Sequence, residues 1–502
     1  YYITHNLYAA KTASTNELWL GGNLSFNLSG ESMTIGMWDD ASVLATHQEF
    51  GGRIVNNDAV LSSSHATHVA GTIMARGYDH DASGMAYEST LHSYDWNNDL
   101  SELSVEANNG LLISNHSYGS AAGWLWNLYD DEKWAWMGDP DLSETEDYKF
   151  GYYSQESYDW DVLANSAPDL LIVKSAGNDR VDTGPDQGEE YWMFGNEPYL
   201  DNTDRSSDGD YDCINGSALS KNVLSVGAVE DLPWGYQSSS DILMSSFSSW
   251  GPTDDGRIKP DIVASGVALY STDNASDDSY LVASGTSSAS PSAAGSLSLL
   301  QEHYINLNDD QSMKATTLKG LVIHTAKEAG LVGPDYQFGW GLLDTKVAAE
   351  LITYNQSNPE SIQEIVLNNN ENIDISFNSL GLSPIKATIV WNDPAGTPVA
   401  PEYNSSTSML VNDLDIRITN ISNGEIFYPW SMQSNPEFPA LVGDNSVDNV
   451  EQIFISSPSE NEYILSVTHK GVLVNDSQLF SLILTSVNVN SDNYCNNGTY
   501  DS

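Results

Sequence analysis

The segment Ser284–Pro291, with the sequence Ser-Gly-Thr-Ser-Ser-Ala-Ser-Pro, contains a serine that could act as a nucleophile. Ser287 follows a Gly-Thr turn, and the residues Ala293, Ala294 and Leu297 predict a helix that begins near it. At a helix start the hydroxyl meets the positive end of the helix dipole, and the backbone N–H of Ser287 points at the group under attack. Serine and threonine are also common helix caps, so an ordinary helix start is the alternative interpretation of this segment taken alone.

A serine nucleophile needs a base within hydrogen-bond reach, and the base needs an acid that orients it. Of the 10 histidines, His65 stands at the start of a small-residue, apolar stretch that predicts a helix. Asp39 ends the apolar run 33–38, which reads as a buried strand. A carboxylate at that end of a strand lies at the usual functional edge of an open parallel sheet. Asp39, His65 and Ser287 are therefore the residues expected to carry the chemistry.

The elements that must position these residues fall into two parts. From about residue 31 to 350, short apolar runs such as 170–173 and 223–226 alternate with helical stretches such as 67–74 and 158–166, which predicts an α/β layer with a mainly parallel sheet. After about residue 355 the strand-like alternation predicts an all-β sandwich or barrel. We expect a catalytic domain over 1–352, a β-barrel or jelly-roll domain over 353–490, and a polar tail over 491–502.

The order Asp, His, Ser along the chain, together with the segments around these residues, resembles the subtilisin-like serine proteases, the subtilases. The resemblance covers roughly residues 6–350. It implies a subtilisin-like three-layer domain in which Ser287 attacks a scissile carbonyl, His65 carries the proton, and Asp39 holds the imidazole. It also implies that His68 is a structural histidine.

The same resemblance assigns an oxyanion donor and a substrate edge. Residues 174–178 resemble the family's Ala-Ala-Gly-Asn element, so Asn178 is expected to bind the oxyanion. Residues 114–119 resemble the edge strand that pairs with the substrate, with backbone hydrogen bonds from Ser117, Tyr118 and Gly119. The wall of the S1 pocket, which holds the side chain before the scissile bond (P1), is expected from Lys174, Ser175, Ala176 and Gly177. An acidic protein favours neutral or basic residues at P1.

Two features depart from, or add to, the family pattern. Asp40 stands where a threonine or serine is frequent after the catalytic aspartate, and a second acid there should raise the pKa of His65. The segments 391–394 and 410–415 look like the small β-barrel appended to one bacterial subtilase branch.

Acidic residues at close spacing predict calcium sites, because calcium takes six to eight hard oxygen ligands. The first candidate set comprises Asp204, Asp208, Asp210 and Asp212, for which a solvated acidic turn is the alternative. A second set could converge in the β domain, and it consists of Asp393, Asp413 and Asp448. Nothing in the histidine and cysteine spacing suggests zinc.

Composition narrows the class of protein. The 502 residues carry 70 acidic against 18 basic side chains, a net charge of −52, which excludes nucleic-acid binding. The acidic residues are dispersed among plentiful aromatic residues, so we expect a halotolerant surface and carboxylates that serve bound cations. No apolar run is long enough to span a membrane. Either the protein is cytosolic or the sequence begins after a processed leader. Cys213 is expected to be buried. The sequence does not decide whether it forms a disulfide with Cys495.

These observations predict a secreted, monomeric, calcium-stabilised endopeptidase that acts on polypeptides. The resemblance to the subtilases further implies an N-terminal pro-segment in the precursor. Three alternatives remain: a processing protease of narrow specificity, a subtilase scaffold used only for binding, and an enzyme of acyl or peptidyl transfer. The tryptophan-rich segment 123–154 is either a substrate-facing flap or a local aromatic mini-core.

Overall fold

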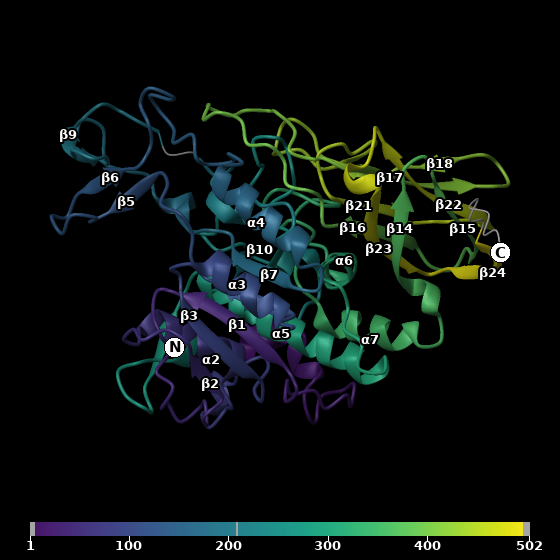
Figure 1. The fold of residues 1–502 in the computed structure, drawn as a ribbon, viewed down its shortest axis with the longest axis horizontal. Coiled ribbons are helices and arrows are strands. Elements are labelled where there is room, and N and C mark those ends of the chain that lie inside the picture. Colours follow the sequence, from purple (N-terminus) through teal and green to yellow (C-terminus); the bar gives the residue numbers. More distant parts are fainter. Residues whose placement is uncertain (1–5, 207–208, 495–502) are drawn as a thin grey trace.

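The computed structural model describes residues 6–206 and 209–494. Its centre is a seven-stranded parallel sheet in the order β11-β10-β7-β4-β1-β3-β2 (Figure 1). The strands are β1 (Thr34–Asp39), β2 (Ile54–Asn56), β3 (Thr90–Asp95), β4 (Ile113–His116), β7 (Leu171–Ser175), β10 (Leu224–Val229) and β11 (Ile262–Ser265). The strand order reverses at β1, whose neighbours are β3 and β4. A reversal of this kind opens a crevice at the carboxyl ends of the strands.

Helices cover both faces of this sheet, because successive strand residues point to opposite sides. Ile35 and Met37 of β1 pack with α2 (Ser64–Met74) and α5 (Thr286–Leu307), whereas Trp38 packs on the other face with α3 (Asp99–Asn108) and α4 (Gln155–Ser166). The remaining α-helices are α1 (Asn6–Thr12), α6 (Ala315–Thr325) and α7 (Thr345–Asn355), and a β-hairpin joins β12 (Leu269–Thr272) to β13 (Tyr280–Ala283). Short 3-10 helices lie at 15–17, 80–82, 179–181, 216–219, 239–241, 359–361 and 474–476.

The tryptophan-rich segment forms a lobe of its own, at the far end of the molecule from the C-terminal strands (Figure 1). Its four-stranded sheet has the order β5-β6-β8-β9. The strands are β5 (Trp124–Trp126), β6 (Trp134–Trp136), β8 (Tyr191–Met193) and β9 (Tyr199–Asp201). Trp124, Trp136, Tyr191 and Met193 are buried together, so the aromatic mini-core is the alternative that the structure supports.

The C-terminal strands form two antiparallel sheets packed over one apolar core, which confirms the all-β prediction. The first sheet contains β14 (Ile362–Asn368), β23 (Ser477–Thr485), β16 (Ile385–Trp391) and β21 (Val450–Ile455), in that order. The second contains β18 (Ile426–Phe427), β17 (Asp413–Asn420), β22 (Glu460–Lys470), β15 (Ile373–Leu380) and β24 (Asn488–Tyr494). A further pair joins β19 (Trp430–Ser431) to β20 (Leu441–Val442).

The sandwich is joined to the α/β part by a shared interior. Val390 and Ile483 of the sandwich belong to the same buried cluster as the residues that cover the parallel sheet. His324 of α6 is buried between the hydroxyls of Thr388 and Thr485, at 2.9 and 3.0 Å. No helix in the described part of the chain is both long and apolar enough to cross a membrane.

Candidate active site

Asp39 and His65 form the orienting pair that the sequence predicts. Asp39 is the last residue of β1 and fully buried, and His65 lies in the first turn of α2. The Nδ1–H of His65 donates to Oδ1 of Asp39 at 2.5 Å, and the backbone N–H of Asp40 donates to the same oxygen at 2.8 Å. His68, one turn further along α2, is buried and bonded to the carbonyl of Leu269, which fits a structural role.

Burial and neighbouring charges shift the pKa values of both Asp39 and His65. Burial lowers the pKa of His65, but the hydrogen bond and charge of Asp39, together with the charge of Asp40, outweigh it and hold that pKa above its usual value. Burial raises the pKa of Asp39 to about 6, against the hydrogen bond and charge of His65, which lower it. The neutral imidazole needed by a general base therefore forms at a higher pH than in an isolated histidine.

Ser287 is the second residue of α5, so its hydroxyl stands at the positive end of a 22-residue helix. Its Oγ donates to the carbonyl of Ser117 at 3.2 Å, and the hydroxyl of Ser117 donates back to the carbonyl of Ser287 at 3.0 Å. Ser287 and His65 line the same cavity, so the candidate nucleophile and the candidate base are both accessible from it.

Asn178 lies after β7 and is oriented by Thr286. Its Oδ1 accepts hydrogen bonds from the backbone N–H and the hydroxyl of Thr286, at 2.9 and 3.0 Å. Because the oxygen is occupied in this way, the amide NH₂ is the group left to donate to a substrate. Asn178 lines the same cavity as Ser287. Two donors, this amide and the backbone N–H of Ser287, can thus serve an oxyanion.

The cavity has a volume of about 490 Å³ and lies at the carboxyl ends of β4 and β7. Six of the predicted substrate-binding residues line it: Ser117, Tyr118, Gly119, Ser175, Ala176 and Gly177. Two acids that the sequence reading missed, Asp179 and Asp182, line it as well. The only signal for them was their place in the sequence, with Asp179 directly after the Gly-Asn pair and Asp182 three residues further on. Burial raises the pKa of Asp179 to about 7, with a further contribution from the charge of Asp182, and raises that of Asp182 to about 6.

The prediction that Lys174 lines the S1 pocket is wrong. Lys174 lies within β7 and its side chain points into the protein, where Nζ sits 3.9 Å from the ring centre of Trp160 and 4.7 Å from that of Tyr118. The alternation of a strand explains this, since neighbouring residues face opposite sides of the sheet. Burial lowers the pKa of Lys174 to about 8.

Of the first predicted calcium set, the described members Asp204, Asp210 and Asp212 do not form a cluster of metal-ligand side chains. Asp204 accepts from the side chain of Gln187 at 2.7 Å and from the backbone of Gly188 at 3.2 Å, and Asp210 pairs with Arg180 at 3.1 Å. Oδ1 of Asp212 is shut off from solvent and has no hydrogen-bond partner. Asp208 lies outside the described residues, as does Cys495, while Cys213 is buried as expected.

The second predicted set is likewise separated, because each carboxylate has donors of its own. Asp393 pairs with Lys221 and accepts backbone N–H groups, and Asp413 pairs with Lys470 at 3.2 Å. Asp448 accepts from the backbone of Ile258 at 2.8 Å. Within the residues that the structure describes, the one cluster of three or more metal-ligand side chains is Asp39, Asp40 and His65, which is the catalytic pair and its neighbour.

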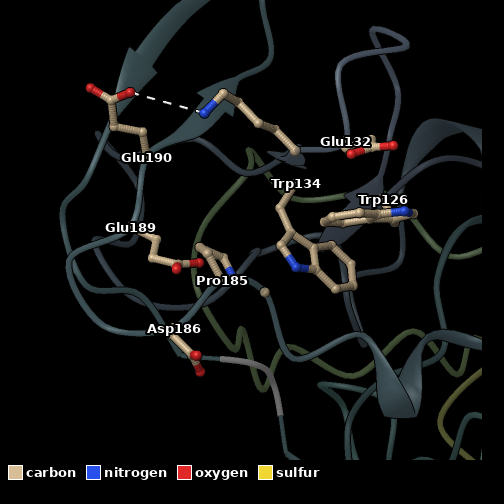
Figure 2. A pocket seen from close by; sticks show the side chains of 9 residues that line it. Trp126, Glu132, Trp134, Pro185, Asp186, Glu189 and Glu190 are labelled. Atoms are coloured by element: carbon tan, nitrogen blue, oxygen red, sulfur yellow. Dashed lines mark ion pairs between the residues drawn. The ribbon is translucent and has the colours of Figure 1, made fainter.

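A second hollow, of about 490 Å³, lies on the tryptophan-rich lobe and is separate from the catalytic cavity. Figure 2 shows Trp126 and Trp134 on one side of it and the acids Asp186, Glu189 and Glu190 on the other. The side chain of Lys133 forms an ion pair with Glu190, with 4.0 Å between Nζ and the carboxylate. None of the predicted catalytic residues lines this hollow.

The parallel α/β core thus brings together, at one candidate site, an aspartate, a histidine and a serine in the chain order Asp39, His65, Ser287. Residues 39–341 match the model of the subtilase family, and the chain belongs to that family. This span includes every predicted catalytic residue.

Several known proteins share parts of the chain. It is 25% identical over 281 residues to the serine protease/ABC transporter B family protein tagA of Dictyostelium discoideum, which covers 49% of this chain and 16% of that protein. It is 34% identical over 134 residues to the C5a peptidase of Streptococcus pyogenes, covering 25% of this chain and 11% of that one. The chain therefore spans only a small share of the length of these relatives. The CspB protease of Clostridium perfringens has a similar fold, with a TM-score of 0.50 and 18% identity over 69% of this chain and 97% of that chain.

Proposed function

We propose that this chain is a secreted serine endopeptidase that cleaves polypeptides through an acyl-enzyme. The observation that carries the proposal is the assembly, on one cavity, of a nucleophile, a base backed by a buried carboxylate, and two oxyanion donors. Membership of the subtilase family supports the same reaction class. A monomer made with an N-terminal pro-segment remains part of the proposal.

In the proposed reaction the hydroxyl of Ser287 turns from the carbonyl of Ser117 toward His65, which takes its proton as the oxygen attacks the scissile carbonyl. Asp39 keeps the imidazole in the tautomer that accepts at Nε2, because Nδ1 donates to its carboxylate. The negative oxygen of the tetrahedral intermediate is held by Asn178 and the backbone N–H of Ser287. His65 then protonates the leaving amine, and a water repeats the sequence on the ester.

We further propose that the enzyme prefers a basic residue at P1. Asp179 and Asp182 line the cavity beside the predicted S1 wall, and among the residues that the structure describes no lysine or arginine lines it. A cationic side chain bound there would neutralise the two carboxylates, whereas an apolar one would leave them desolvated and unpaired.

The test combines active-site labelling with proteolysis. A fluorophosphonate should label the wild-type protein and Ser288→Ala, in which a buried neighbouring serine is changed, but not Ser287→Ala. The wild-type protein should also hydrolyse unfolded casein, and Ser287→Ala should not.

The other outcomes distinguish the alternatives. Labelling without casein cleavage would replace the general endopeptidase by a processing protease of narrow specificity. A product in which an added amine, in place of water, receives the acyl group would indicate acyl transfer. If correctly folded protein shows neither labelling nor cleavage, the result would indicate a binding protein built on a subtilase scaffold.

A further inference from the structure

The four tryptophans of the lobe hairpin lie on one face of its sheet, in two pairs. In the antiparallel register Trp124 is opposite Trp136 and Trp126 is opposite Trp134, and residues two apart in a strand project to the same side. The inner pair is buried, whereas Trp126 is 56% exposed and lies edge-to-face against Trp134, with 5.3 Å between ring centres. The outer pair therefore leaves aromatic surface open to the hollow on the lobe.

The inner pair shows which kind of group can occupy such a ring. The guanidinium of Arg205 lies over the ring of Trp136, 4.0 Å from its centre, and a nitrogen of the same group pairs with Asp201 at 3.2 Å. A cation in this position is attracted by the negative face of the ring and by the carboxylate together. The lobe thus contains one complete binding site for an arginine side chain, filled from its own sequence.

The outer pair has the same components without the cation. The hollow beside it is lined by one basic side chain, Lys133, and by four carboxylates, those of Glu132, Asp186, Glu189 and Glu190. Four negative charges against one positive charge leave an excess of three, and Lys133 is already paired with Glu190. Among the residues that the structure describes, no lysine or arginine lies over either outer ring, and none pairs with Asp186 or Glu189 (Figure 2). Open aromatic rings among unpaired carboxylates repel an anion and suit a cation.

The hollow is joined to the catalytic cavity by one short stretch of chain. Asn178 and Asp182 line the catalytic cavity, and Gly184 and Asp186 line the hollow. Gly184 has a φ of +74° and lies so close to the inner pair that a β-carbon there would be 2.5 Å from Trp124, so this segment packs directly on the tryptophans. Asp182 and Gly184 are two residues apart, a span of at most about 7 Å. A polypeptide bound in the catalytic cavity can therefore reach the hollow within a few residues of its scissile bond.

We propose that the hollow is an exosite, a site outside the catalytic cavity that binds an arginine side chain of the polypeptide substrate. Its guanidinium stacks on Trp126 or Trp134 and pairs with Asp186 and Glu189. Arginine suits the site better than lysine, because its planar group stacks on a ring and presents several donors to the carboxylates. The inference rests on the proposed function for the identity of its ligand, although the site itself uses no residue of the triad. It is also separate from the P1 preference proposed for the catalytic cavity.

The test uses peptides with arginine fixed at P1 and a second residue that is moved stepwise away from the scissile bond on either side. This second residue is arginine or citrulline, which has nearly the same shape without the charge. At the position that reaches the hollow, arginine should lower KM about tenfold relative to citrulline with little change in kcat, because the exosite binds substrate and transition state alike. The difference should shrink in 1 M sodium chloride.

Two variants and one control assign this difference to the hollow. It should disappear in Trp126→Leu and in the double variant Asp186→Asn with Glu189→Gln. Trp234→Leu changes a tryptophan that is 90% exposed outside the hollow, and it should behave like the parent. Fluorophosphonate labelling at the parent's rate and an unchanged melting temperature check that the variants keep their fold. If Trp126→Leu fails this check, the double variant carries the test, since its carboxylates have no cation partner to lose.

Binding of the same peptides to the Ser287→Ala protein, measured by calorimetry, separates the exosite from the proposed function. Tighter binding of the arginine peptide that is lost in Trp126→Leu, without hydrolysis by the parent, would contradict the proposed function and support the exosite. Normal hydrolysis with equal KM and equal binding for arginine and citrulline at every position would overturn the exosite alone. An arginine preference that survives in both variants would overturn it as well. So would a neutral oligosaccharide that binds through Trp126 while arginine and citrulline peptides bind equally.

Discussion

Replacing Asp40 by Asn should move the acidic limb of the pH–activity profile to lower pH. Asp40 is exposed, directly follows the buried Asp39, and its charge helps to hold the pKa of His65 above its usual value. Catalysis needs neutral His65, so activity is lost as the pH falls through the pKa of that imidazole. Removing the Asp40 charge lowers the pKa of His65. The variant therefore stays active at a pH where His65 of the parent protein is already protonated.

The size of this effect follows from the geometry. The ligand atoms of Asp39, Asp40 and His65 lie within 4.8 Å of one another. Because Asp40 is exposed and the His65 side chain is 43% exposed, a water-like dielectric is the appropriate choice. Coulomb's law then gives a contribution of about 0.6 pH unit to the pKa of His65. At 1 M salt the screening length falls to about 3 Å, so most of the difference should vanish.

The assay is kcat/KM for a peptide substrate from pH 4.5 to 9, at low ionic strength and in 1 M sodium chloride. Asp141→Asn, an exposed acid on the lobe, controls for the change in net charge alone. The reasoning fails if the acidic limb of Asp40→Asn coincides with that of the parent at low salt. It also fails if the limb moves upward, or if Asp141→Asn shifts it equally.

Three other variants probe the oxyanion donor, the domain contact and the S1 pocket. Asn178→Ala should lower kcat by about 10²–10³ with little change in KM, because its amide acts on the transition state; an unchanged kcat would remove Asn178 from the oxyanion site. Lys221→Met should destabilise the protein by about 3–5 kcal/mol in urea unfolding, since it leaves Asp393 buried without its cation, and the double variant with Asp393→Leu should recover most of the loss. Changing both Asp179 and Asp182 to Asn should reduce the preference for arginine over leucine at P1 by about tenfold. In the parent this preference should increase between pH 5 and 8, because the raised pKa values of these acids delay their ionisation; a preference independent of pH would contradict the assignment.

The parts of the site that the sequence predicts are those carried by local motifs. Asp39, His65, Asn178 and Ser287 each lie at the end of a strand or the start of a helix, where a short segment fixes the side chain's direction. The fold class follows for the same reason, since apolar periodicity marks parallel strands and helices directly.

The features that the sequence does not predict depend on contacts between distant segments. The direction of Lys174 depends on which face of β7 meets Trp160. The proximity of Asp212 to Asp254 depends on how both residues pack against Gly151. The lobe sheet pairs β6 with β8, whose residues are more than 50 positions apart, so no local pattern could reveal it.

The interior shared by the α/β part and the sandwich affects how the chain gains and loses structure. The match to the subtilase family ends at residue 341, yet Val390 and Ile483 complete the packing of the catalytic part, and His324 has both its hydroxyl partners in the sandwich. A chain cut after α7 would expose this apolar face to water. The end of the family match is therefore not the end of a folding unit. The α/β part and the sandwich should unfold together in a single cooperative transition. During synthesis, the α/β part should become stable only after the last strands of the sandwich have been made.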